Sequence, residues 1–234
     1  MFELRPIQEQ KSSELAKVVR KKRIGILAGE VRSGKTLTVL ATAEKLNKKH
    51  VLFITKKKAI FSIESDYKIG SFKYKLTLIN YESIHKVETK GVDLVICDES
   101  HTMGAFPKPS KRTKAVRDIV ATNKIDLILA SGTIHPESIA QIFHQLWVSY
   151  FTPFNNVNFY HWAKVYVDLY HIKINGFDVK QYNRTHDELI EEKIKPLKVT
   201  MTQSDAGFTS KVFENFEVVE LLPITYNLIK KLKT

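Results

Sequence analysis

The sequence predicts an α/β fold in which a mostly parallel sheet carries helices on both faces. Apolar runs that suit strands alternate with stretches that suit helices through the first two thirds of the chain. The runs VLFI, LVIC and LILA are continuous rather than alternating, which is typical of strands buried on both faces of a parallel sheet. The predicted strands cover residues 24–28, 51–55, 75–79, 92–97 and 125–130, and a helix is expected over residues 36–46.

The alternation of strand-like and helix-like stretches ends after Pro136, and a largely helical extension is expected over residues 136–195. Its helices are placed at Pro136–Tyr150 and Asn183–Lys193, while Phe151–His171 between them is unusually rich in aromatic residues. Two interpretations of these rings are open, a layer packed onto the core and a surface that stacks bases, and packing is favoured. A strand is expected over residues 212–222 and the start of another helix over residues 223–232.

Charge and composition limit the class of protein. Lys and Arg number 37 against 25 Asp and Glu, for a net charge of +12, which favours an anionic partner such as nucleic acid but also fits a lysine-rich, well-solvated surface. The single cysteine, Cys97, argues against an internal disulfide framework and for a reducing compartment. No secretory signal and no run approaching about 18 apolar residues is visible, so the expectation is a cytoplasmic protein (in the host if viral) without membrane contact.

A phosphate-binding loop is predicted directly after the first strand. Residues 29–36, GEVRSGKT, fit the pattern G-x-x-x-x-G-K-[ST], and they precede the predicted helix. Backbone amides and the positive helix end would hold the phosphates of a nucleotide, Lys35 would neutralise the β- and γ-phosphates, and the Thr36 hydroxyl would bind Mg²⁺. The loop residues expected to bind nucleotide are Gly29, Arg32, Ser33, Gly34, Lys35 and Thr36.

Two carboxylates follow the strand LVIC. Because ligands in open α/β sheets bind at the carboxyl ends of the strands, Asp98 and Glu99 are predicted to lie beside the phosphate loop. Asp98 would hold the hydration shell of Mg²⁺, and Glu99 would orient or deprotonate the attacking water. Lys35, Asp98 and Glu99 are therefore the candidate catalytic residues, and ATP and Mg²⁺ the expected ligands.

Small polar residues end the strand LILA in the same way. Ser131, Gly132 and Thr133 could hydrogen-bond to the acidic pair and sense the γ-phosphate, or could serve only as a strand-to-helix turn. His101 could couple nucleotide state to nucleic acid, or be a plain turn histidine. The run Lys56–Lys58 follows a predicted strand and could contact a nucleic-acid backbone, although charge runs are commonly just solvated.

In order and spacing, these segments resemble the motif series of superfamily-two helicases, in particular the Swi/Snf-type branch and its phage-borne members. The matching segments are Leu4–Gln8 (Q motif), Gly29–Thr36 (motif I), Val51–Lys58 (motif Ia), Ile79–Glu82, Asp98–His101 (the DEAD/DEAH box), Ser131–Thr133 (motif III) and Phe143–Trp147. The resemblance implies that Arg5 and Gln8 bind the adenine end of ATP. It also implies that Thr55, Lys56, Lys57 and Tyr81 contact DNA.

The resemblance further implies a RecA-like lobe over residues 1–222, with residues 223–234 starting a connection to a second lobe. ATP would lie between the lobes, and its hydrolysis would drive movement on DNA, most simply along a duplex. Nothing in the sequence resembles the arginine finger of the second lobe, so we expect a fragment that is weakly active or inactive alone. Motif Ia lacks the family's usual proline, and Ile134 stands where the branch has proline after Ser131–Thr133.

Two other functions remain open on the sequence. A viral DNA-packaging ATPase of the terminase type also combines a phosphate loop, an Asp-Glu pair and a later motif of small residues. A nucleotide-gated DNA-binding module without turnover of its own would need the same nucleotide site but no arginine finger.

Overall fold

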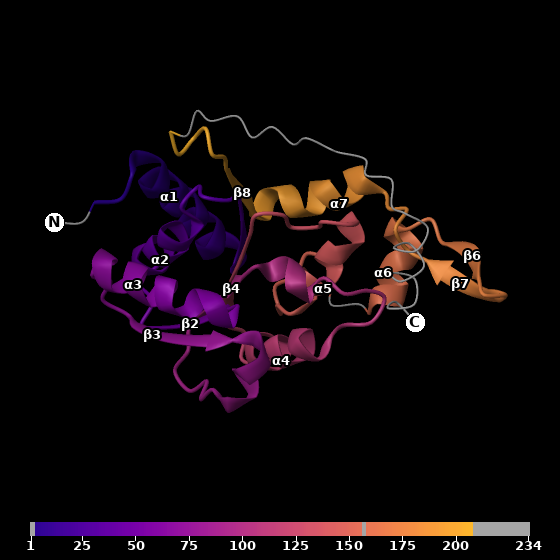
Figure 1. Ribbon diagram of the computed structural model, residues 1–234, viewed down its shortest axis with the longest axis horizontal. Coiled ribbons are helices and arrows are strands. Elements are labelled where there is room, and N and C mark those ends of the chain that lie inside the picture. The colour runs from indigo at the N-terminus through magenta and orange to yellow at the C-terminus, as the bar shows by residue number, and fades with distance from the viewer. Residues whose placement is uncertain (1–2, 156–157, 208–234) are drawn as a thin grey trace, which may run out of the picture.

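The core is a six-stranded sheet in which all neighbouring strands are parallel, as the computed structural model shows for residues 3–155 and 158–207 (Figure 1). The strand order is β3-β2-β4-β5-β1-β8. The predicted parallel α/β fold is therefore confirmed, with strand ends close to those expected. The bounds are β1 Ile24–Gly29, β2 His50–Thr55, β3 Lys75–Asn80, β4 Leu94–Asp98, β5 Asp126–Ser131 and β8 Lys198–Met201.

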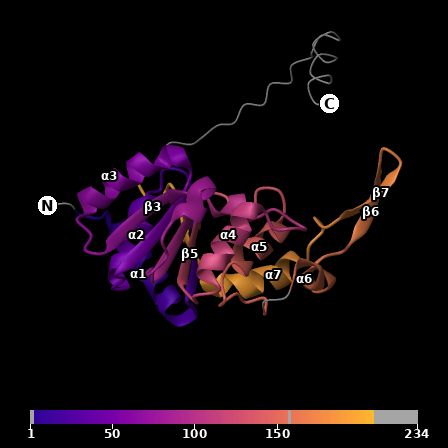
Figure 2. The ribbon, with the colours of Figure 1, turned by 90° about the horizontal axis from the view of Figure 1, so that it is seen from below.

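Helices cover both faces of this sheet (Figure 2). On one face α1 (Pro6–Lys22), α2 (Lys35–Lys45) and α3 (Ile60–Gly70) bury an apolar cluster that includes Leu15, Leu40 and Ile63. On the other face α4 (Lys111–Val120), α5 (Ile142–Trp147), α6 (Phe159–Tyr166) and α7 (Asp187–Ile194) bury a second cluster around Phe143 and Trp162. The longest of these helices, α1, has 17 residues, and no helix in the described ranges is long and apolar enough to cross a membrane.

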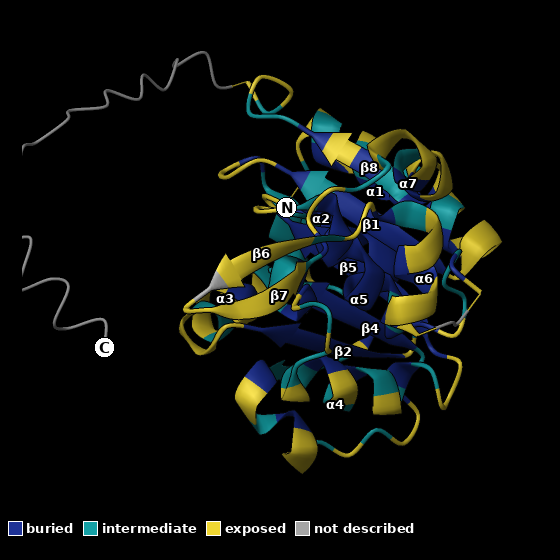
Figure 3. Ribbon diagram, turned by 90° about the vertical axis from the view of Figure 1, so that its right-hand side faces the viewer, coloured by how far each residue is buried: buried dark blue, intermediate teal, exposed yellow. Residues whose placement is uncertain are grey.

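The segment after Pro136 is less helical than expected. The helix expected over 136–150 reduces to a 3₁₀ turn and the short α5, and the helix expected from Asn183 begins at Asp187. Between α6 and α7 the chain forms an antiparallel hairpin, β6 (Tyr170–Ile174) and β7 (Phe177–Gln181), which projects from the body (Figure 2) and is mostly exposed (Figure 3). The extension thus contains the helices α5, α6 and α7, with a hairpin between the last two that was not expected.

The hairpin has a local cause in its turn. Asn175 and Gly176 both have positive φ, 51° and 85°, as a two-residue hairpin turn requires. The dipeptide Asn-Gly between alternating strands is a strong signal for such a turn, so this feature was readable in the sequence. The strand and helix expected over residues 212–232, and the connection expected at 223–234, lie outside the described residues.

The aromatic segment packs against the core. Phe154, Phe159 and Trp162 are at most 4% exposed, and the ring centroids of Phe143 and Trp162 lie 5.2 Å apart. Rings buried in this way have no free face for a base, so packing is the correct interpretation for these three side chains. Tyr160 on the same helix is 44% exposed and faces the surface.

His144 is enclosed by this aromatic layer. Its ring stacks on Phe159 at 5.6 Å, and its Nδ1–H donates a 2.6 Å hydrogen bond to the carbonyl oxygen of Ala105. Burial, assisted by the nearby charge of Arg117, lowers the pKa of His144 to about 4, although the hydrogen bond to Ala105 opposes the shift. His144 is therefore held neutral inside the fold.

We predict that His144 makes the protein less stable at mildly acidic pH. In the unfolded chain the histidine binds a proton at its ordinary pKa of about 6.5, whereas the folded chain resists protonation down to about 4. The free energy of unfolding should therefore fall as pH drops through this window, by up to about 3 kcal/mol. Urea titrations of wild type and His144→Gln at several pH values would measure the effect.

The quantity to compare is the slope of the free energy of unfolding against pH. The free energy itself also changes with packing when His144 is replaced. His171→Gln, an exposed histidine on the hairpin, serves as the control and should keep the wild-type slope. An unchanged slope in His144→Gln would contradict the prediction.

Candidate nucleotide site

The register of the parallel strands brings the predicted site residues to one edge of the sheet. Ile54 pairs with Cys97, Asp98 with Ala130, and Ala28 with Ser131. Thr55, the next residue on β2, therefore lies level with Asp98, and Gly29 on β1 lies one residue beyond the level of Ser131. The carboxyl ends of these strands meet at one edge of the sheet. This is the edge at which open α/β sheets bind ligands.

The phosphate loop is a tight turn that depends on its glycines. Gly34 has φ of 95°, and a Cβ on Gly29 would lie 2.5 Å from Cγ of Lys35. The fully buried Ser33 closes the turn by donating a 2.8 Å hydrogen bond from its hydroxyl to the carbonyl oxygen of Glu30. Arg32 also adopts a left-handed conformation, with φ of 63°. Larger residues at either glycine would displace the lysine or strain the backbone.

The N-terminus of α2 is free to bind an anion. No side chain in the described part of the chain caps it at Gly34. The amides of the first helical turn, which include those of Lys35 and Thr36, thus point out of the helix end with its partial positive charge. Nζ of Lys35 lies 2.9 Å from the carbonyl oxygen of Glu30, a neutral acceptor that a phosphate oxygen can replace. The loop therefore fits a nucleotide phosphate chain.

Asp98 is held in place by two hydroxyl groups. Thr55 donates a 2.8 Å hydrogen bond to Oδ2 of the carboxylate, and the Tyr81 hydroxyl donates one of 2.8 Å to the backbone carbonyl oxygen of Asp98. Thr55 is fully buried and Tyr81 is 3% exposed. The resemblance implied DNA contacts for both, but their side chains are occupied inside the site, whereas Lys56 and Lys57 are exposed.

Burial shifts the charges of this site toward neutrality. Desolvation raises the pKa of Asp98, assisted by the neighbouring Glu99 and opposed by the hydrogen bond from Thr55. Desolvation also lowers the pKa of Lys35, although Glu99 and Asp98 both favour its charged form. A buried carboxylate that is costly to ionise gains most from a cation placed beside it. The donor set of Asp98 and Thr36 oxygens therefore fits Mg²⁺.

His101 joins the acidic pair to the segment Ser131–Thr133. Its Nδ1 lies 2.8 Å from the Ser131 hydroxyl oxygen and 3.3 Å from Oε2 of Glu99. The Ser131 hydroxyl donates to the carbonyl oxygen of Thr133 at 2.7 Å, so the hydrogen shared with His101 belongs to Nδ1. Gly132 completes the group, because a Cβ placed on it would be 3.8 Å from Nζ of Lys35. The four residues expected to couple the motifs thus lie together.

Gln8 lies against the phosphate loop. Its Oε1 accepts a 2.9 Å hydrogen bond from the backbone N–H of Arg5, and its Nε2 donates one of 3.4 Å to the carbonyl oxygen of Gly34. The side chain is 3% exposed, and a Cβ on Gly34 would lie 2.5 Å from its Nε2. Gln8 therefore supports the loop here, and adenine binding by Arg5 and Gln8 stays a prediction.

Gln145 supports the site from within the matching segment Phe143–Trp147, in which no individual residue was assigned a role from the sequence. Its Oε1 accepts a 2.9 Å hydrogen bond from the Ser100 hydroxyl, and its Nε2 donates one of 2.6 Å to the carbonyl oxygen of Ile134. The residue is fully buried on α5. An amide between apolar residues of a short helix was the available signal, since buried polar groups require partners.

We predict that Asp98→Asn makes the protein at least as stable as wild type at neutral pH. The folded protein binds a proton on Asp98 more readily than the unfolded chain does, so wild-type stability is lost as pH rises from about 4 through the raised pKa. An asparagine oxygen can still accept the hydrogen bond from Thr55 but carries no charge. Thermal unfolding of both proteins should show a difference that grows in favour of the variant as pH rises. A variant clearly less stable than wild type at pH 7 would contradict it.

Comparison with known proteins supports the α/β fold of this chain. Residues 1–65 match the sequence model of a family described as "Type III restriction enzyme, res subunit". No curated protein matches the chain. The structure is similar to the SWI2/SNF2 ATPase core domain of Sulfolobus solfataricus, with a TM-score of 0.58, 19% identity and 87% of this chain covered. The match spans 44% of that protein, so this chain corresponds to less than half of its length. The fold is thus the RecA-like α/β fold of such an ATPase core.

Proposed function

We propose that this chain is the ATP-binding lobe of a DNA-dependent ATPase, a helicase or duplex DNA translocase, which hydrolyses ATP to drive movement on DNA when paired with a second RecA-like lobe. The observation that carries the proposal is the convergence of Lys35, the Asp98–Glu99 pair and the His101–Ser131 hydrogen bond at one sheet edge. A phosphate loop alone would serve many functions, whereas this combination fits control of hydrolysis.

Nucleotide binding would rest on the loop and the end of α2. The amides at the helix end would bind the phosphates, and Lys35 would exchange its hydrogen bond to Glu30 for a phosphate oxygen. Thr36 and Asp98 would hold Mg²⁺, mainly through water. Bound there, the ion would neutralise charge on the phosphate oxygens in the transition state.

Glu99 is the residue proposed to act on the attacking water. It follows Asp98 in a left-handed conformation with φ of 51°, which turns the chain out of the sheet after β4. Its carboxylate is partly exposed, and His101 lies 3.3 Å from its Oε2. From this position it can orient an attacking water and accept its proton, while Asp98 keeps its own carboxylate on the cation side.

The proposed partner is DNA. Lys56 and Lys57 are exposed immediately after β2, at the same edge of the sheet as the nucleotide site, and the chain carries a net charge of +12. Contacts from lysines to phosphates would be independent of sequence and weakened by salt. The second lobe would supply the arginine finger, so the chain alone should turn over ATP slowly.

We predict that Lys35→Ala weakens binding of Mg-ATP at least tenfold, because it removes the ammonium group that is proposed to neutralise the β- and γ-phosphates. Titration with a fluorescent ATP analogue measures this. Lys45→Ala is the matched control: it lies at the far end of the same helix, pairs with Glu9, and should bind like wild type. Equal affinity in Lys35→Ala and wild type would refute an ATP site here.

A further inference from the structure

Phe61 is an exposed aromatic side chain at the predicted DNA edge. It is 83% exposed, more than any other large hydrophobic side chain in the described ranges. Within those ranges its ring contacts no other aromatic ring. Ile63, two positions later on α3, is 1% exposed and faces the core. Two positions are about 200° of helical rotation, so Phe61 faces away from the sheet.

Lysines surround this ring on one side. The 3₁₀ turn Lys57–Ala59 runs directly into α3, and Lys57 and Lys58 precede Phe61 by four and three residues. Side chains at these spacings lie toward the same side of a helical segment, so both lysines are expected on the side of the chain that Phe61 faces. All of Lys56–Lys58 are exposed, and the positive end of α3 adds to their charge.

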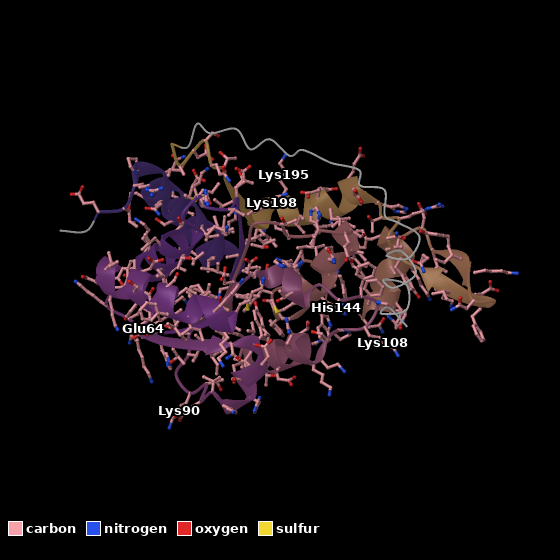
Figure 4. All side chains as sticks on the ribbon, in the orientation of Figure 1. Glu64, Lys90, Lys108, His144, Lys195 and Lys198 are labelled. Atoms are coloured by element: carbon pink, nitrogen blue, oxygen red, sulfur yellow. The ribbon has the colours of Figure 1, made fainter. Side chains whose placement is uncertain are left out.

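Acidic residues on α3 limit this positive surface to its first turn. Glu64, at the periphery of the molecule in Figure 4, pairs with Lys68 at 2.8 Å. A partner that suits both features must carry negative charge opposite the lysines and an apolar flat face opposite Phe61. Nucleic acid has both, provided that the face of a base is free.

We propose that Phe61 stacks on an unpaired base while Lys57 and Lys58 bind the flanking phosphates. The inference rests on the proposed nucleic-acid partner and goes beyond it, because a base inside a duplex has no free face for this ring. The strand that crosses this edge would therefore be single-stranded, or carry an unpaired base at a fork or gap.

The test compares wild type, Phe61→Ala and Phe61→Leu for binding a single-stranded oligothymidine and a fully paired duplex at the same salt concentration. Phe61→Ala should bind the single strand about tenfold more weakly and the duplex unchanged. Phe61→Leu should resemble Phe61→Ala, since it keeps bulk but has no ring. Ile69→Ala, at the other end of α3 and 51% exposed, is the control for a lost apolar surface residue and should bind like wild type.

Phe61→Trp gives a direct readout of stacking. Its indole fluorescence should be quenched by the single strand and not by the duplex, and the wild-type signal gives the background from the native tryptophans. Loss of binding to both substrates in Phe61→Ala, unchanged binding to both, or no selective quenching would each overturn the stacking site while leaving the DNA partner in place. A wild-type chain that binds neither substrate would instead overturn the proposed partner.

Discussion

The register between the parallel strands is the constraint on which the site depends. Because Ile54 pairs with Cys97 and Ala28 with Ser131, the ends of β1, β2, β4 and β5 lie at one level. Side chains alternate between the faces of a strand, so a slip of one residue would send Thr55 and Asp98 to opposite faces. The continuous apolar runs hold these strands in the core, and Leu94, Val95 and Ile96 are fully buried. The sheet is therefore the element that brings together residues more than a hundred positions apart.

The burial of charged groups is the second constraint on the site. It lowers the stability of the fold but favours the binding of a cation. The carboxylate of Asp98 is desolvated at the end of β4, which raises its pKa and makes its ionised form costly. The hydroxyl of Thr55 offsets part of that cost, since a hydrogen bond to a charged group contributes about 1.5–3 kcal/mol. A cation that binds beside Asp98 would offset the rest of the cost of ionising this carboxylate. Lys35 shows the converse, because its pKa is lowered by the same burial that brings it near the phosphates.

The sequence predicted the central sheet well because buried parallel strands leave continuous apolar runs. It failed where that signal is weak. The edge strand β8 is only Lys198–Met201, with two of its four residues polar or charged, and it pairs with β1 across a long separation in sequence. The hairpin β6–β7 alternates apolar and polar residues around Asn175-Gly176, a signal that was present but was outweighed by its helical neighbours.

Within the site, the sequence predicted which residues lie at the carboxyl edge of the sheet. It did not predict the direction in which their side chains point. The motifs placed Thr55 and Tyr81 at the correct edge, yet both hydroxyls point inward to Asp98. Strand alternation decides which face a side chain takes, but at the end of a strand the chain turns, and the local pattern no longer sets direction. The contacts of Gln8 and Gln145 are equally unreadable, because each joins segments that are distant in sequence.

Gln145 also shows how the aromatic layer is joined to the nucleotide site. Its amide binds Ser100, next to Glu99, and the carbonyl oxygen of Ile134, next to Thr133. The same helix, α5, carries Phe143 and His144 into the aromatic layer. The acidic segment and the segment after β5 therefore cannot move apart without breaking a buried hydrogen bond, which would leave a polar group unpaired at a cost of about 1–3 kcal/mol. Any rearrangement at His101 and Ser131 is thus more easily accommodated if α5 and the layer packed on it move with them.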